Sequence, residues 1–389
     1  GLGDVYKRQG NYRTSWSGTN PLADDTYNKS PWTHDDVSNR TYFEITFIPG
    51  LKWRTNFSVD FYQYNYDGYV NSEYGFAAGY KGSAYKESDR NLSYTINNLL
   101  TYEKSFGDHS LSVLLGQEAY ALEYKLLSAE KQGFPFPGVT EIGSAAVMSS
   151  MNSYTDKYRL LSWLSRVEYD YKDRYYISGS FRTDGSSRFH PDNRWGQFWS
   201  LGGSWRISNE EFMKPYSSWL DNLKLRASYG SLGNNTLGDN RDKDGNYMSQ
   251  SMFAQTNYVL GRTVVNGLSQ TAIANADLTW ETTYITNIGV DYGLFGNRFS
   301  GSIEYFDKRT KGILIDLPAP MVHGNATVPK QNSAKVSNRG IEFTTSWNDK
   351  IGKDFSYNVG FNFTYIKNNV DKFKGGDASY DGARMLKEG

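Results

Sequence analysis

The sequence predicts an all-β protein built from long antiparallel strands, and three observations support this. Apolar and polar residues alternate with a period of two along most of the chain, as expected of strands whose two faces meet different surroundings. The 389 residues include 31 Tyr, 21 Phe and 10 Trp, so 16% are aromatic although only 38% are hydrophobic. Short turn sequences alternate with long polar loops, which indicates hairpins joined in chain order.

The alternation is clearest in LKWRTNFSVDF, NLKLRASYG and FSYNVGFNFTY, which begin at Leu51, Asn222 and Phe355. Each segment has one largely apolar face along its whole length, whereas the opposite face is polar or glycine. About twelve such segments occur, and many approach the ~10 residues expected of a tilted strand that crosses a membrane. We expect strands to begin near Arg40, Leu51, Asn91, His109, Leu160, Arg174, Trp195, Asn222, Thr283, Arg298, Arg339 and Phe355.

The connections are of two kinds. Short turns are predicted at 49–50, 105–108, 171–174, 294–297 and 348–354. Long polar loops are predicted at 66–90, 126–156, 235–280 and 310–337. A longer turn, SNEEFMKPYSSWLDN, predicts a short helix from Glu210.

This layout predicts the fold class: a large antiparallel up-and-down transmembrane β-barrel with short periplasmic turns and long extracellular loops. Aromatic residues gather near the short turns, where rings at a membrane interface belong. The alternative is a soluble β-sandwich or solenoid, but sandwich strands are typically about half as long, ~5–6 residues.

Composition excludes several function classes. The 42 Lys and Arg balance the 42 Asp and Glu, and this neutrality argues against a nucleic-acid partner. With no Cys there is no disulfide, Cys-based zinc site or catalytic thiol. The four His are scattered rather than set at ligand spacing, and no apolar run approaches the ~18 residues of a transmembrane helix.

Two polar motifs resemble functional loops. FRTDGSSRF at 181–189 contains two serines, but nothing marks a base for either, so we interpret it as a strand-to-loop transition. Asn240, Asp242, Asp244 and Gly245 have calcium-loop spacing, yet Ser251 stands where the closing Glu is required. A solvated turn is therefore favoured over a loosely bound calcium, and we predict no enzyme, no cofactor and no metal site.

Five long blocks resemble consecutive barrel segments of SusC/RagA-type TonB-dependent outer-membrane transporters. They are DRYYISGSFRTDGSSRF, NRWGQFWSLGGSWRISNEEFM, LDNLKLRASYGSLGNN, WETTYITNIGVDYGLFGNRFSGSIEYFDKRTKGIL and SNRGIEFTTSW, in the family's order. The resemblance implies outer-membrane import of oligosaccharides or peptides, with a SusD-like surface lipoprotein above the barrel. It also implies that the TonB complex acts through a plug domain inside the lumen. A siderophore or vitamin receptor, and a passive porin or adhesin barrel, stay open as alternatives.

The ends of the chain carry two expectations. DVYKRQ near the start matches one translated frame of a sequencing-library adapter, so we expect residues 1–9 to be non-native and 10–389 to be the barrel domain. A plug does not precede the first strand and the chain closes on DGARMLKEG, so we expect an incomplete barrel.

Aromatic residues in the predicted loops are the candidates for ligand binding, because sugar rings stack on aromatic faces. Loop packing, or contact with a lid protein, is the competing interpretation. The candidates are Tyr74, Phe76, Tyr80, Tyr85, Phe134, Phe136, Phe253 and Tyr258.

Overall fold

The computed structural model describes residues 25–73, 75–236, 246–315, 326, 330–373, 379–381 and 384–386. The expected adapter residues 1–9 lie outside this range. So do Tyr74 and the four calcium-loop residues Asn240, Asp242, Asp244 and Gly245.

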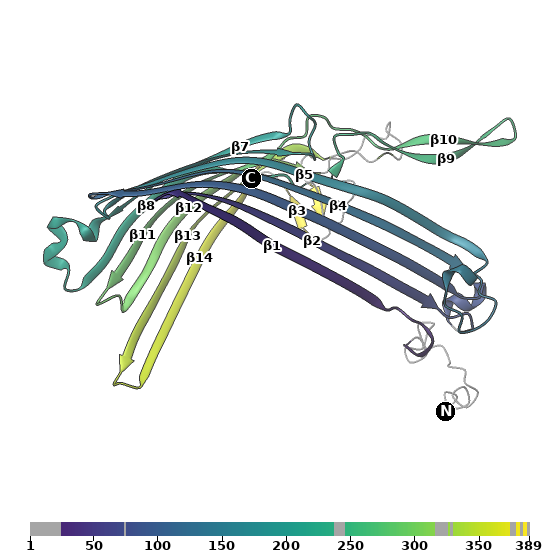
Figure 1. Cartoon of the computed structure of the whole chain (residues 1–389), viewed down its shortest axis with the longest axis horizontal. Helices are drawn as coiled ribbons and strands as arrows, with labels where there is room; N and C mark the ends of the chain where they lie inside the picture. The colour runs from purple at the N-terminus through teal and green to yellow at the C-terminus, as the bar shows by residue number, and fades with distance from the viewer. Residues whose placement is uncertain are drawn as a thin grey trace. The chain divides into compact units, whose positions relative to one another are not determined.

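Twelve strands form one antiparallel sheet, which confirms the predicted all-β fold (Figure 1). Neighbours in the sheet follow chain order except where β8 pairs with β11. The strands are β1 (Trp32–Ile48), β2 (Leu51–Val70), β3 (Ser83–Phe106), β4 (His109–Gln132), β5 (Val147–Tyr171), β6 (Tyr175–Ser186), β7 (Trp195–Arg206), β8 (Leu220–Asn234), β11 (Glu281–Leu294), β12 (Phe299–Ile315), β13 (Gln331–Ile351) and β14 (Phe355–Phe373).

Four further strands form two separate hairpins. The pair β9 (Met252–Leu260) and β10 (Thr263–Ala272) lies between β8 and β11, inside the predicted loop 235–280. The pair β15 (Ser379–Asp381) and β16 (Arg384–Leu386) follows β14.

The strands that follow long loops begin earlier than predicted. β1, β3, β5 and β13 begin 8, 8, 13 and 8 residues before the expected starts at Arg40, Asn91, Leu160 and Arg339. The loop limits 66–90 and 126–156 were therefore wrong, because the connections shrink to 71–82 and 133–146. Strands after the short turns begin within two residues of the prediction.

Residues 25–27 form a single α-helical turn, and the other helices in the described residues are short 3₁₀ turns. They are η1 (Phe76–Tyr80), η2 (Ile142–Ser144), η3 (Ile207–Asn209) and η4 (Glu211–Tyr216), the last being the helix expected from Glu210. Pro215 inside η4 limits its length. Throughout the described part of the chain, no helix is long and apolar enough to cross a membrane.

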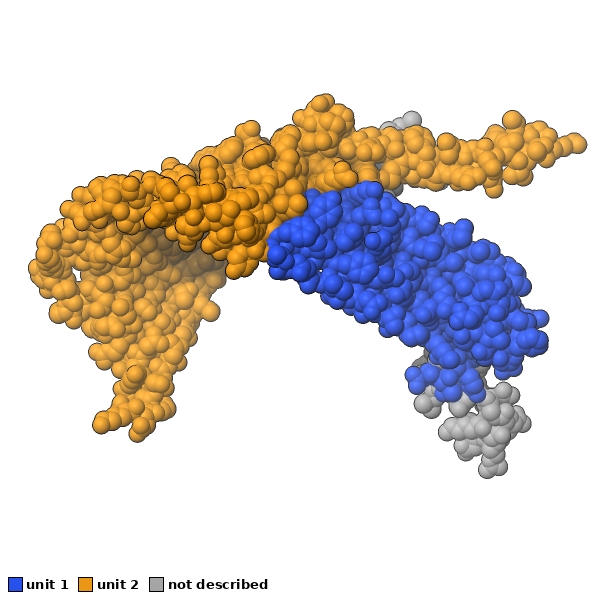
Figure 2. Space-filling model, in the orientation of Figure 1, with its two compact units in different colours: residues 1–41, 57–95, 120–158 blue, residues 42–56, 96–119, 159–389 orange. Residues whose placement is uncertain are grey.

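The chain divides into two compact units, coloured separately in Figure 2. Unit 1 comprises residues 1–41, 57–95 and 120–158, and unit 2 comprises 42–56, 96–119 and 159–389. In unit 1 a small core contains Tyr69, Ala84, Phe134 and Ala145. In unit 2 a second core contains Phe189, Phe198, Leu278, Trp280 and Leu314.

Gly50 fixes the tight turn between β1 and β2, and its replacement should be costly. Its φ is +89°, and an added Cβ would stand 2.1 Å from the carbonyl oxygen of Glu103. We expect Gly50→Ala to lower the free energy of unfolding by about 2 kcal/mol or more, since the left-handed backbone alone costs ~1–2 kcal/mol. Gly107→Ala is the control in a denaturant titration, because φ there is +58° with nothing within 4 Å. Equal losses would show that the Glu103 contact has no effect.

Candidate ligand-binding surfaces

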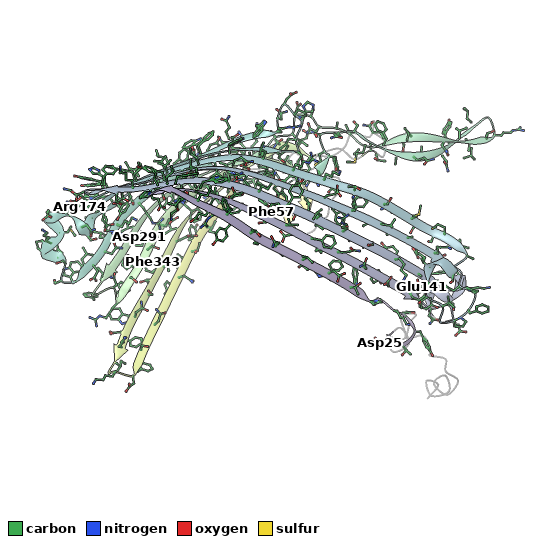
Figure 3. The ribbon with its side chains drawn as sticks, viewed as in Figure 1. Asp25, Phe57, Glu141, Arg174, Asp291 and Phe343 are labelled. Carbon is green, nitrogen blue, oxygen red and sulfur yellow. The ribbon has the colours of Figure 1, made fainter. Side chains whose placement is uncertain are left out.

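One side of the sheet in unit 2 is apolar and exposed. The register places Leu225, Val290, Ile303, Phe343 and Phe363 in one row across five strands (Phe343 is labelled in Figure 3). Leu225, Ile303 and Phe363 are 41%, 48% and 53% exposed. A continuous apolar face of this extent requires a non-aqueous neighbour, which here indicates lipid.

The apolar band has a limit at each end. Toward the turns, the Phe299 ring lies 5.5 Å from Tyr292 and 6.0 Å from Trp347. Toward the loops, the same side carries the ion pair of Arg339 with Asp307, at 3.2 Å. From Phe299 to Asp307 a strand rises about 26 Å, close to the ~25 Å height of a lipid-facing band.

Aromatic rings gather at the short turns, as predicted. Tyr171 stacks on Tyr175 and Tyr175 stacks on Trp205, each with ring centroids 6.4 Å apart. The Tyr175 hydroxyl and the Trp205 Nε1–H both donate to Glu210, at 2.6 and 2.9 Å. This belt of rings with polar tips suits the edge of a bilayer.

The opposite side of the sheet in unit 2 is polar. Arg226 pairs there with Asp291 at 3.1 Å and with Glu304 at 2.5 Å (Asp291 is labelled in Figure 3). A hollow of about 540 Å³ lies on this side near the short turns, lined largely by small polar residues and two cations. Its lining includes Ser110, Ser178, Gly202, Ser204, Lys224 and Ser228. This surface can bind polar groups, and the ring that it presents beside its cations is Tyr176, 4.5 Å from the Lys224 Nζ.

Unit 1 carries a strip of aromatic rings on β1, β2 and β3, which we call the aromatic strip. Its members are Trp32, His34, Tyr62, Tyr64, Tyr66 and Tyr85. Trp32 lies 4.4 Å from Tyr66 and His34 stacks on Tyr64 at 4.7 Å, measured between ring centroids. Tyr85 extends the strip to β3, 5.9 Å from Tyr66.

The aromatic strip lies on the polar side of the sheet. On β2 the tyrosines occupy even positions from Tyr62, whereas the apolar Phe57, Val59 and Phe61 occupy odd positions (Phe57 is labelled in Figure 3). Asp60, at an even position, shares the side of the strip. In a barrel this side faces the lumen.

Within unit 1 the strip lies toward the loop end of β2, beyond the apolar residues Phe57, Val59 and Phe61. At this level the outward side carries charges instead of apolar residues: Lys86 pairs with Asp67 at 2.7 Å, and Lys157 with Glu123 at 3.1 Å. Lys86 also reaches Glu141, at 3.6 Å (Glu141 is labelled in Figure 3). Charges on both sides place this part of the sheet in water.

Carboxylates and further tyrosines adjoin the strip on β3, β4 and β5. The Tyr85 hydroxyl donates to Glu87. Burial raises the pKa of the Asp89 carboxyl, although a hydrogen bond from Tyr124 partly opposes this rise. Burial also raises the pKa of the Tyr85, Tyr124 and Tyr154 phenols. Tyr124 packs against Tyr154 with ring centroids 5.8 Å apart.

The predicted loop aromatics are distributed over several places, and only Tyr85 joins the strip. Phe76 and Tyr80 lie in η1 and are 75% and 43% exposed, while Phe136 is 67% exposed. Phe134 is 2% exposed, because its ring packs against Tyr69 in the core of unit 1. Phe253 and Tyr258, 60% and 64% exposed, lie on β9.

Sequence reasoning missed most of the strip. The segment YQYNY, with Tyr62, Tyr64 and Tyr66 at every second position, could have indicated the strip, because three rings with that spacing share one side of a strand.

The segment 181–189 with its two serines forms the predicted strand-to-loop transition: β6 ends at Ser186, and Phe189 belongs to the core of unit 2. Within the described residues, no group of three or more His, Cys, Asp or Glu could hold a metal ion.

Comparison with known proteins decides the family. Residues 2–386 match the family described as "TonB dependent receptor-like, beta-barrel". The chain belongs to this family. Its members are outer-membrane β-barrels that act as transporters or receptors rather than as enzymes, and the chain is an outer-membrane barrel protein of this kind.

Two curated relatives confirm the SusC/RagA resemblance within this TonB-dependent receptor family. The chain is 31% identical to TonB-dependent receptor P3 of Formosa agariphila over 96% of its length, and 30% identical to TonB-dependent receptor SusC of Bacteroides thetaiotaomicron over 92%. It covers 37% and 35% of those two proteins, so it spans about a third of their length.

Solved structures show the same likeness. The structure of the RagAB peptide transporter matches 97% of this chain with a TM-score of 0.86 and 25% identity, and the match covers 42% of that chain. The siderophore receptor PiuA from Acinetobacter baumannii matches 93% of this chain and 50% of its own, with a TM-score of 0.54 and 10% identity, which shows the fold alone.

Proposed function

We propose that the chain forms part of the β-barrel wall of a SusC-like transporter, which imports oligosaccharides or peptides across the outer membrane. The observation that carries this proposal is the likeness to SusC and to RagAB along almost the whole sheet. The two-sided sheet is consistent with it: the apolar band of unit 2 meets lipid, and the polar side provides a hydrophilic path.

The proposal includes two partners. A barrel larger than these twelve strands would enclose a lumen with room for a plug, and a TonB complex would draw on that plug to release substrate inward. A SusD-like lipoprotein would cover the loop end. The exposed aromatic residues of β9, Phe253 and Tyr258, are suitable contacts for such a lid, because aromatic residues are enriched in protein interfaces.

Two alternatives are less well supported. A siderophore receptor would share the fold, but the TM-score of 0.54 to PiuA is far below the 0.86 to RagAB. A passive porin would need neither a plug nor TonB, and the family match argues against it.

Uptake in cells tests the proposed function. The full-length gene should be expressed in a Bacteroidetes host that lacks its own SusC-like transporters, with and without a co-expressed SusD-like lipoprotein. We expect uptake of fluorescent oligosaccharides or peptides that disappears when tonB is deleted. Uptake of the same compounds without TonB would favour a passive porin, and uptake restricted to iron chelates would favour a siderophore receptor.

A further inference from the structure

We propose that the aromatic strip of unit 1, with the adjoining Glu87 and Asp89, binds a neutral oligosaccharide at the lumen side of the loop end. This inference deepens the proposed function and rests on it, since it names the substrate class and a place where substrate binds. Three features of the residues carry it: accessible rings, uncommitted acceptors and a negative charge.

The rings are accessible and form a platform. Trp32 is 58% exposed and Tyr62 is 38% exposed, although both lie on the polar side of the sheet. Aromatic rings that only pack in a hydrophobic core are buried. The Tyr69 and Phe134 rings of the same unit are an example, since they are 5% and 2% exposed. The strip crosses three strands, about 10 Å at the ~4.8 Å spacing of strands, and so offers several sugar units a stacking surface.

The hydrogen-bonding groups beside the rings are mainly acceptors. The Tyr85 hydroxyl is committed to Glu87 and the Tyr124 hydroxyl to Asp89. Oδ1 of Asp89 is buried and accepts no hydrogen bond from any described residue. Because that oxygen is buried, Asp89 acts on a ligand through its charge, whereas the half-buried Glu87 carboxylate can accept hydrogen bonds from donors such as sugar hydroxyls. Peptide N–H and ammonium groups are donors as well, so the binding test below includes a cationic peptide as the competing ligand.

The charge of the surface selects neutral glycans over acidic ones. Arg40 neutralises Asp60 at 2.8 Å, but Glu87 and Asp89 form no ion pair with a cation in the described part of unit 1. The negative groups of uronic acids and sulfated sugars would be repelled by the carboxylates of Glu87 and Asp89, and this repulsion would weaken binding in a partly buried site. Neutral sugars would gain charge-assisted hydrogen bonds instead.

Binding to the purified full-length transporter tests the proposal. Isothermal titration calorimetry should compare neutral gluco-, xylo-, galacto- and manno-oligosaccharides with an oligogalacturonate and a cationic peptide. We expect binding of at least one neutral oligosaccharide, with about a tenfold weaker Kd for Trp32→Ala. The control is Phe76→Ala, which removes a ring that is 75% exposed in the same unit but outside the strip, and its Kd should not change.

Asp89→Asn separates binding from folding. Because burial raises the pKa of Asp89 in the folded state, its charged form lowers stability above that pKa. The neutral amide should therefore keep or raise the melting temperature at pH 7 while the Kd for the sugar becomes several-fold weaker. Loss of binding with a lower melting temperature would contradict this assignment.

The outcomes distinguish the site from the function. Equal Kd changes in Trp32→Ala and Phe76→Ala, preference for the acidic glycan or the peptide, or no binding of any neutral glycan would overturn the site. If TonB-dependent uptake persists in those cases, the proposed function stands without it. If neutral glycans bind through Trp32 but TonB-dependent uptake is absent, the site stands and the transport proposal fails.

Discussion

Replacing Leu225 by Arg is expected to destabilise the folded barrel by about 2–4 kcal/mol, the cost of a cationic side chain at the middle of a lipid-facing band. Leu225 belongs to the row of Ile303 and Phe343, which lies midway between the aromatic rings at Phe299 and the charged pair at Asp307. Its 41% exposure shows that the side chain projects from the sheet rather than into a core. Refolding of the full-length transporter into bilayers, followed by urea titration, measures the loss.

Ser228→Arg is the matched control on the same strand. Ser228 lies three residues after Leu225 and lines the hollow of about 540 Å³ on the polar side, which has room for a guanidinium group. We expect its free energy of unfolding to change by less than about 1 kcal/mol. Equal losses for the two variants would show that the side of the sheet facing lipid has been assigned wrongly.

The number and order of the strands could be predicted because alternation is strong where the two sides of a strand meet different surroundings. Beyond the apolar band both sides meet water, and the pattern fades although the hydrogen-bonded ladder continues. Strand β5 shows this: its first residues from Val147 include the run SSMNS, which alternates weakly, and its start was placed at Leu160. Within the twelve-stranded sheet the errors are therefore confined to strand ends that adjoin long loops, whereas the hairpin of β9 and β10 inside the predicted loop 235–280 was not predicted.

The candidate site was predicted less well, for the same reason. Aromatic residues were sought in loops, and Tyr66 was placed at the edge of one, yet the rings that come together lie on strands. Trp32 and Tyr66 are 34 residues apart, and only the pairing of β1 with β2 brings them to 4.4 Å. The sequence shows the spacing within one strand, but the register between strands depends on the turn and the whole ladder.

Arg226 connects three neighbouring strands through ion pairs on the polar side of the sheet, opposite the apolar band. Its guanidinium contacts Asp291 at 3.1 Å and Glu304 at 2.5 Å. The register sets Glu304 directly opposite Glu342, a pairing of like charges that is unfavourable in a sheet. Gly289, the residue opposite Arg226, leaves room for the guanidinium, since an added Cβ would lie 3.0 Å from its Cζ.

Arg226→Met should therefore destabilise the barrel through the carboxylates left behind. The Arg226 and Glu304 side chains are 34% and 19% exposed, so solvent screens part of the interaction, and we expect a loss of about 1–3 kcal/mol at neutral pH. The double variant Arg226→Met with Glu304→Gln should recover much of that loss, because it removes the acid that the arginine neutralises. Urea titrations of the single and double variants give the coupling energy. A double variant with the full sum of the two single losses would show that Arg226 stabilises the barrel by packing and not by charge.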